Sequence, residues 1–149
     1  MRIVRLADQA FDPALEMRPL EAAMPQAGGL ASFLGKVRPT DGTQALELSH
    51  YEPLTLPGME ALADQALARF DLEGLLIIHR IGVMQPGDAI VLVTAGARHR
   101  RAAIEAVDFT MDHLKSDAWF WKRELRADGW HWIEPRGQDH SDLARWQQG

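Results

Sequence analysis

The spacing of apolar residues along the chain changes between two and three to four positions, which predicts both strands and helices. Some segments are alternating or continuously apolar, as strands are: residues 2–6, 28–38, 45–51, 75–83, 89–95, 119–125 and 130–134. Others have the apolar spacing of helices: residues 59–70, 98–115 and 139–146. The pattern predicts an α+β fold, with a mixed, mainly antiparallel sheet and packed helices.

Proline, glycine and capping residues predict where these elements begin and end. Asp12 before Pro13 predicts a helix start, because Asp caps helices and Pro suits the first helical position. Pro19 is expected to divide that helix into two short pieces, and the Pro-rich segment 53–58 is expected to be a connection. Residues 85–88, Gln-Pro-Gly-Asp, predict a tight turn that joins two buried strands into a hairpin.

The segment 98–124 carries most of the candidate chemistry. Its apolar residues Ile104, Val107, Met111 and Leu114 predict one buried stripe on a helix. Lys115 follows that stripe directly, and a Trp-Phe-Trp run then predicts a strand. Aromatic neighbours exclude water, and desolvation lowers the pKa of a lysine so that it can act as a base or nucleophile. The alternative is a solvated basic face above an ordinary core stripe.

Composition restricts the possible functions. The 149 residues fit one domain, 1–149, and a net charge of −5 argues against general nucleic-acid binding. Basic residues at 98–101 and 115–123 would form a local positive site for a small anion. The absence of cysteine excludes thiolate metal sites and cysteine nucleophiles, and no histidine spacing predicts a metal. Without a long apolar run we expect no membrane span and no signal peptide, hence a cytoplasmic protein.

The length of the predicted helix separates two groups of candidate residues. Arg100 and Lys115 lie fifteen positions apart, which corresponds to about 22 Å along one helix. One small ligand cannot contact both ends of such a helix. Either the two ends have different roles, or a site is assembled from two copies of the chain.

Six short motifs occur in a characteristic order: Phe33-Leu34-Gly35-Lys36-Val37-Arg38, His79-Arg80-Ile81-Gly82, Pro86-Gly87-Asp88, His99-Arg100, Leu114-Lys115 and Trp121-Lys122-Arg123-Glu124. Together they resemble the catalytic (large) subunit of molybdopterin synthase, over residues 28–146. The chain departs from that family at Trp119, where the family has Pro, and slightly in segment 53–59.

The resemblance implies a hammerhead-like α/β fold and a sulfur-transfer reaction. The family converts cyclic pyranopterin monophosphate into molybdopterin by inserting two sulfurs as a dithiolene. A small ubiquitin-like partner delivers each sulfur as a thiocarboxylate on its C-terminal Gly-Gly. The family forms a homodimer with one small partner at each end, a heterotetramer, and this subunit needs no cofactor of its own.

The resemblance also implies roles for individual residues. Lys115 and Lys122 match the family's active-site lysines, which we expect to hold the thiocarboxylate and assist proton transfer. The matching substrate positions are Lys36, Val37, Arg38, His99, Arg100, Arg123, Glu124 and Arg136. The positive charge of the basic residues among them suits the cyclic phosphate and developing oxyanions.

Two other functions remain open from the sequence. The chain could be a binding module that holds the sulfur-carrier partner or a pterin without turnover, although both lysines and Arg38 favour an enzyme. It could also be a hydrolase of a phosphorylated small molecule, although no metal site or evident nucleophile supports that interpretation. His79, within an apolar run, is expected to be a satisfied core or edge histidine.

Overall fold

The computed structural model describes residues 1–40, 42–116, 119–134 and 137–148. Its helices are α1 (Pro13–Ala22), α2 (Glu52–Arg69), α3 (Arg100–Ser116) and α4 (Gly137–Ala144), followed by the 3-10 turn η1 (Arg145–Gln148). Its strands are β1 (Arg2–Ala7), β2 (Gly29–Lys36), β3 (Ala45–His50), β4 (Gly74–Arg80), β5 (Gly82–Met84), β6 (Ala89–Ala97), β7 (Phe120–Arg126) and β8 (Gly129–Ile133). The α+β expectation is confirmed.

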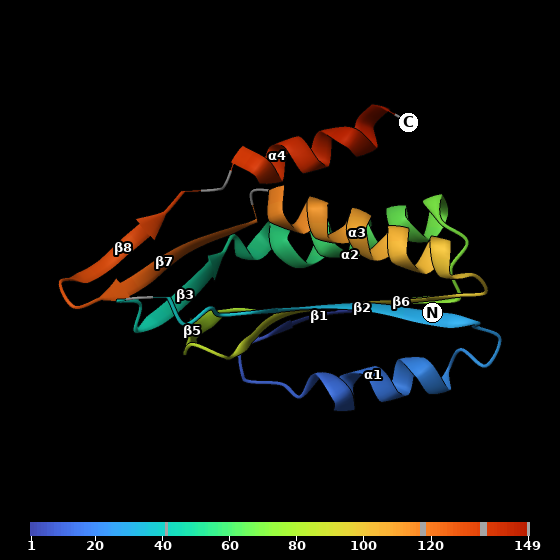
Figure 1. The fold of residues 1–149 in the computed structure, drawn as a ribbon, viewed down its shortest axis with the longest axis horizontal. Helices are drawn as coiled ribbons and strands as arrows, with labels where there is room; N and C mark the ends of the chain where they lie inside the picture. Colours follow the sequence, from blue (N-terminus) through green and yellow to red (C-terminus); the bar gives the residue numbers. More distant parts are fainter. Residues whose placement is uncertain (41, 117–118, 135–136, 149) are drawn as a thin grey trace.

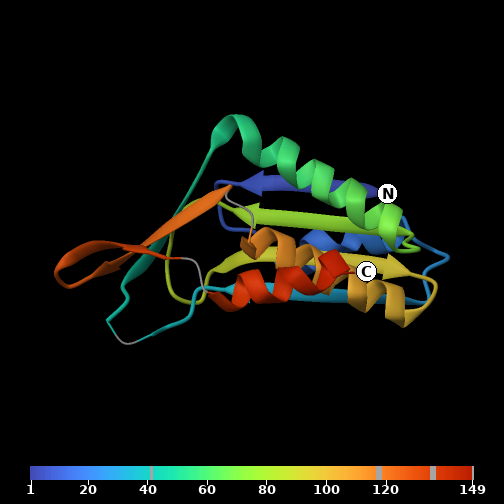
Figure 2. The same cartoon turned by 90° about the horizontal axis from the view of Figure 1, so that it is seen from above.

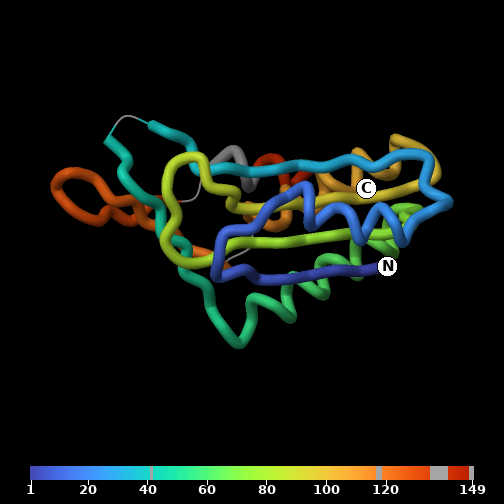
Figure 3. Tube along the Cα trace, turned by 90° about the horizontal axis from the view of Figure 1, so that it is seen from below, coloured from blue at the N-terminus to red at the C-terminus, as the bar shows by residue number. Residues whose placement is uncertain are grey.

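The first sheet has the strand order β1-β4-β6-β2. Its β1–β4 pair is parallel, and the β4–β6 and β6–β2 pairs are antiparallel. Helices α2 and α3 cover one face, α1 covers the other, and α4 lies outside α3 (Figures 1 and 3). Because helices cover both faces, every residue of β4 is buried, and the strand is nearly all apolar.

The second sheet has the order β5-β3-β7-β8, and all its pairs are antiparallel. It extends from one end of the first sheet, with the β7–β8 hairpin at its tip (Figure 2). The prediction of one strand over 75–83 is wrong, because the chain leaves the first sheet at Ile81 and enters the second at Gly82. Gly82 has a φ of 90°, a conformation that glycine adopts without steric cost.

Turn and cap chemistry was predicted correctly in two places. The side chain of Asp12 accepts a hydrogen bond from the amide of Ala14, and Pro13 begins α1. In the 85–88 turn, the amide of Asp88 donates to the carbonyl of Gln85 at 3.0 Å, and Gly87 has a φ of 93°. The predicted hairpin forms between β4 and β6.

The two proline-based interruptions are wrong. Helix α1 is continuous through the exposed Pro19, because the buried Leu20 and the half-buried Met17 pack it against the first sheet. Helix α2 begins at Glu52 and therefore includes the segment 53–58. Pro53 stands in its first turn, where an amide hydrogen is not needed, and the buried Thr55 donates to the carbonyl of Tyr51 at 2.8 Å.

The buried stripe of α3 differs from the predicted one. Val107 and Leu114 are buried as expected, but Ile104 is 55% exposed and Met111 is only half-buried. The packed positions are mostly smaller residues, namely Ala103, Ala106, Val107, Phe109, Thr110 and Leu114. Small side chains at Ala103, Ala106 and Thr110 allow α3 to lie close to the sheet, and the stripe is rotated away from Ile104 and Met111.

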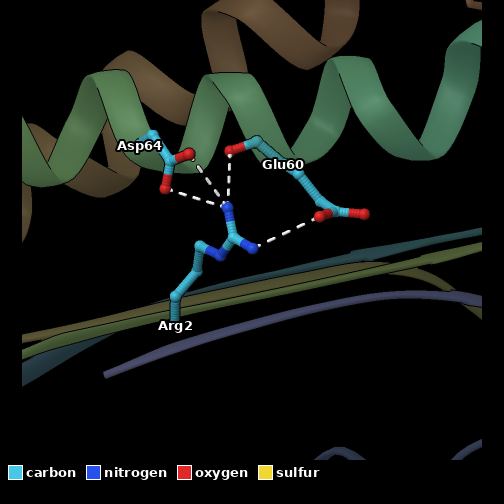
Figure 4. A network of polar contacts seen from close by, with 3 residues as sticks. All are labelled: Arg2, Glu60 and Asp64. Carbon is cyan, nitrogen blue, oxygen red and sulfur yellow. Dashed lines mark hydrogen bonds and ion pairs between the residues drawn. The ribbon is translucent and has the colours of Figure 1, made fainter.

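An exposed polar network links β1 to α2. The guanidinium of Arg2 contacts the Asp64 carboxylate at 2.9 and 3.0 Å and the Glu60 carboxylate at 3.2 Å (Figure 4). Exposed ion pairs of this kind contribute at most about 1 kcal/mol. In the part of the chain that the structure describes, no helix is long and apolar enough to cross a bilayer.

The two places where the sequence departs from the family lie in contact. Gly58 is in α2, and a β-carbon added there would overlap the indole of Trp119. The amide of Tyr51, which precedes α2, also donates to the carbonyl of Trp119 at 3.0 Å. The glycine in segment 53–59 therefore provides the space that the larger residue at position 119 needs.

We expect Gly58→Ala to destabilise the protein, although alanine is favoured over glycine inside a helix by about 1 kcal/mol. Overpacking against the rigid indole costs about 1–3 kcal/mol and outweighs that gain. The coupling free energy between residues 58 and 119 is measured by urea unfolding of the wild type, Gly58→Ala, Trp119→Ala and the double variant. In the Trp119→Ala background, Gly58→Ala should stabilise the protein. A more stable Gly58→Ala single variant would contradict this packing.

Candidate functional site

The two candidate catalytic lysines lie on either side of the connection from α3 to β7. Lys115 is in the last turn of α3, exposed to solvent, directly after the buried Leu114. Lys122 is half-buried on β7, two positions after Phe120, and so shares a strand face with it. We call the group of Lys115, Phe120, Lys122 and His79 the lysine junction.

His79 forms the buried wall of the lysine junction. It is 5% exposed and lies in β4, where its ring stacks on Phe120 with a centroid distance of 3.9 Å and an interplanar angle of 13°. Its Nδ1 lies 2.9 Å from the carbonyl oxygen of Arg80. Since a carbonyl only accepts, Nδ1 carries the hydrogen and donates it. The expectation of a satisfied core histidine is confirmed.

Burial and the two lysines keep His79 neutral. Burial lowers the pKa of His79 to about 4. The hydrogen bond to Arg80 opposes this shift, and the charges of Lys115 and Lys122 add to it. The imidazole is therefore neutral at pH 7, and the positive charge of the junction belongs to the lysines.

The segment after β2 approaches the same end of the first sheet. Val37 is buried, and its backbone is fixed to the 85–88 turn by hydrogen bonds of 2.9 Å to Asp88 and 2.8 Å from Gly87. Lys36 and Arg38, on either side of it, are exposed. Lys36 lies opposite Ala89 at the start of β6, far from Ala97, where β6 leads towards α3. All three lysines of the sequence thus belong to this end of the first sheet.

His99 and Arg100 lie at the opposite end, where α3 begins. With Gly28, Arg98 and Arg101 they line a hollow of about 480 Å³. Gly28 is needed for this close packing, because a β-carbon there would overlap the carbonyl of Arg98. Helix α3 is continuous from Arg100 to Ser116, so one chain keeps this hollow about 22 Å from Lys115.

The remaining candidates on β7 have other contacts. Arg123 pairs with the carboxylate of Glu47 at 2.7 Å and lies 4.4 Å from the ring centre of Trp130, on the face opposite Lys122. Glu124 accepts from Thr43 at 3.0 Å and pairs with Arg126; the hydrogen bond from Arg126 is the main cause that lowers the pKa of Glu124. Arg136 lies outside the described residues.

The structure therefore divides the predicted site within one chain. The segments that carry Lys115, Lys122, Lys36 and Arg38 belong to one end of the first sheet, and His99 and Arg100 lie at the other. Sequence reasoning did not place His79 and Phe120 in the site, because they become neighbours of the lysines through sheet packing. The His-Arg-Ile-Gly motif was the available signal.

The junction suits an anion that exchanges protons. Two ammonium groups can hold a carboxylate-like group by charge-assisted hydrogen bonds. The neutral His79 and the Phe120 ring limit access of water from the side of the first sheet. Among the described residues, no group of three or more His, Asp or Glu side chains could hold a metal ion.

The fold and site define an α+β protein with a cationic site where a mixed sheet meets an antiparallel extension. A model of the MoaE protein family matches residues 6–117. The chain therefore belongs to the MoaE protein family.

Individual relatives agree with this family and with the fold. The chain is 44% identical over 147 residues to a Caulobacter vibrioides protein named molybdopterin synthase catalytic subunit, covering 98% of each. It matches the structure of the molybdopterin biosynthesis MoaE protein from Burkholderia ambifaria with a TM-score of 0.84 and 39% identity, covering 99% of each chain. This match confirms the expected hammerhead-like fold. The chain also has the fold of a chain in a Helicobacter pylori complex of subunits 1 and 2 of molybdopterin-converting factor. That comparison gives a TM-score of 0.75 and 24% sequence identity.

Proposed function

We propose that this protein is the catalytic subunit of molybdopterin synthase, a cytoplasmic sulfurtransferase of molybdenum cofactor biosynthesis. Its substrate is cyclic pyranopterin monophosphate, and the sulfur comes from the C-terminal Gly-Gly thiocarboxylate of a small ubiquitin-like partner. The observation that carries the proposal is that Lys115 ends α3 and Lys122 lies on β7, on either side of one connection and next to the buried His79, in a chain 44% identical to a relative with that name.

The roles of the lysines follow from their surroundings. The exposed Lys115 is accessible to a partner's chain end, and its ammonium group can bind the thiocarboxylate by charge-assisted hydrogen bonds. The half-buried Lys122 can supply and remove protons as sulfur adds to the pterin side chain. Lys36 and Arg38, exposed at the same end of the sheet, suit the cyclic phosphate, and the backbone of Val37 holds them there. Arg123, Glu124 and Arg136 also remain candidates for binding the substrate. The resemblance to the family is the only support for these three residues.

The direct test is turnover of cyclic pyranopterin monophosphate with thiocarboxylated partner, followed by mass detection of the dithiolene product. Formation of molybdopterin is the expected result. A protein that binds the partner without forming product would be a binding module instead. A protein that releases phosphate from the substrate without any partner would be a hydrolase.

We further propose that two copies of this chain, each working as one domain, form the core of a heterotetramer. Strand β2 is an edge strand of the first sheet, and three large apolar residues on it are partly exposed: Leu30 (37%), Phe33 (44%) and Leu34 (39%). Exposed apolar edges of this kind favour association. A second copy would also supply His99 and Arg100 to a site whose lysines come from the first.

Mixed dimers test the shared site. Arg100→Ala and Lys115→Ala chains should each be inactive alone, and together they should rebuild one intact site out of two. Activity should then recover towards half the wild-type value per dimer, measured on mixed dimers verified by native mass spectrometry. Verified mixed dimers that stay inactive would exclude sharing of these residues.

A further inference from the structure

One ring contact joins the two sheets next to the lysines. His79 lies near the end of β4 in the first sheet, and Phe120 is the first residue of β7 in the second. Their rings are nearly parallel, at 13°, with centroids 3.9 Å apart. The stack therefore fixes where β7 begins relative to the buried centre of the first sheet.

The imidazole is itself held in one orientation. Its Nδ1 donates to the carbonyl of Arg80 at 2.9 Å. The Arg80 side chain in turn contacts the carbonyl of Val83 at 3.3 Å and the Asp88 carboxylate at 3.5 Å. These contacts tie the backbone beside the ring to the 80–88 segment, in which Arg80 and Met84 are buried. A ring fixed in this way is a rigid support for Phe120.

Both lysines depend on the element that this support places. Lys122 lies two residues beyond Phe120 on the same face of β7, so any shift of Phe120 moves the Lys122 ammonium group. Lys115 is carried by α3, which packs independently on β2 and β6. The distance between the two ammonium groups is therefore set by how β7 is seated against β4. Burial is the main cause that lowers the pKa of His79, and the charges of both lysines add to it.

We propose that His79 is a positioning residue: by stacking on Phe120 it sets the separation of Lys115 and Lys122. This inference rests on the proposed function of the two lysines, but the stack also has a geometric consequence that is measurable without turnover. Misplacing a catalytic group by about 1 Å can reduce the rate by about 100-fold. His79 itself is not expected to touch substrate.

Two substitutions test the flat ring of His79 separately from its hydrogen bond to Arg80. His79→Phe and His79→Leu both fill the buried site with an apolar side chain, and both remove the hydrogen bond to the Arg80 carbonyl. They differ in that phenylalanine keeps a flat ring against Phe120. We expect His79→Leu to lower kcat by about 10- to 100-fold with little change in KM, and His79→Phe to stay within about 3-fold of wild type. Equal losses in both variants would overturn the proposal.

A second measurement does not need activity. The chain has three lysines, so labelling with an amine-reactive reagent and peptide mass mapping gives the rates for Lys122 and Lys115 relative to Lys36. His79→Leu should change the relative rate of Lys122, and His79→Phe should leave it unchanged. If wild-type protein fails to turn over with the partner, the proposed function fails, and the labelling ratios still decide on the positioning role. Unchanged ratios in His79→Leu would overturn it.

Ile77→Val is the matched control for general loss of stability. Ile77 is fully buried on the same face of β4, two residues before His79, in the core cluster between the first sheet and helices α2 and α3. Its variant should lower the melting temperature while kcat and the labelling ratios stay at wild-type values. If Ile77→Val reproduces the kcat loss of His79→Leu, the effect is core destabilisation and the proposal is wrong.

Discussion

Lys115→Ala is expected to fold as well as wild type and to lose about 10²- to 10⁴-fold of its turnover. Lys115 is exposed on the last turn of α3, so its removal leaves the buried stripe that ends at Leu114 intact. The lost ammonium group would have bound the thiocarboxylate and assisted proton transfer. The measurement is molybdopterin formation with thiocarboxylated partner, together with the melting temperature. Lys122→Ala should show a loss of the same kind, with a milder effect.

Arg18→Ala is the matched control for this experiment. Arg18 is also an exposed cation on a helix, but α1 covers the face of the first sheet opposite to α3. Its variant should keep wild-type turnover, which separates a specific role from loss of positive charge. Near wild-type turnover of Lys115→Ala would exclude the assigned role of the lysine.

Acidification should destabilise the protein through His79. Burial lowers the pKa of His79 from 6.5 to about 4, so between these values the unfolded chain binds a proton that the folded chain does not. The stability that comes from keeping His79 neutral in the folded state is fully present above pH 6.5. It is lost as the pH falls towards 4. At 1.36 kcal/mol per pKa unit, the free energy of unfolding should fall by about 3 kcal/mol. Urea unfolding between pH 7 and 4 measures this loss.

His79→Phe provides the reference for the acid experiment. Phenylalanine cannot take up a proton, so the variant should lack the part of the pH dependence that comes from residue 79. The carboxylates and the other histidines titrate equally in both proteins and cancel in the difference. Parallel curves for wild type and variant over this range would show that His79 does not cause the acid loss.

Local chemistry determined which elements were predicted correctly. The cap at Asp12 and the turn at 85–88 depend on neighbours in sequence, and both were found as expected. Pro57 was predicted to belong to a connection, but it lies inside α2. The buried face of this helix, which includes Met59 and Leu62, favours a long helix. The break at Gly82 also depends on tertiary structure, since each half of the apolar run pairs in a different sheet.

The sequence predicted a set of candidate site residues but not their arrangement. The resemblance supplied Lys115 and Lys122, and helix length alone separated Arg100 from Lys115. The position of His79 beside the lysines was not predictable, because it results from packing between strands about 40 residues apart in sequence. Ile104 was assigned to the core from its apolar spacing with Val107 and Leu114, whereas small residues such as Ala103 and Ala106 pack against the sheet instead.

The strand order of the first sheet has a consequence for synthesis on the ribosome. Strand β1 pairs with β4 and β2 pairs with β6, so neither early strand has a neighbour until residues 74–97 have been made. The nascent chain must therefore keep two unpaired strands in solution while α2 emerges. Such high contact order slows folding and exposes strand edges. Chaperone demand should thus fall on the first half of the chain, far in sequence from Lys115 and Lys122.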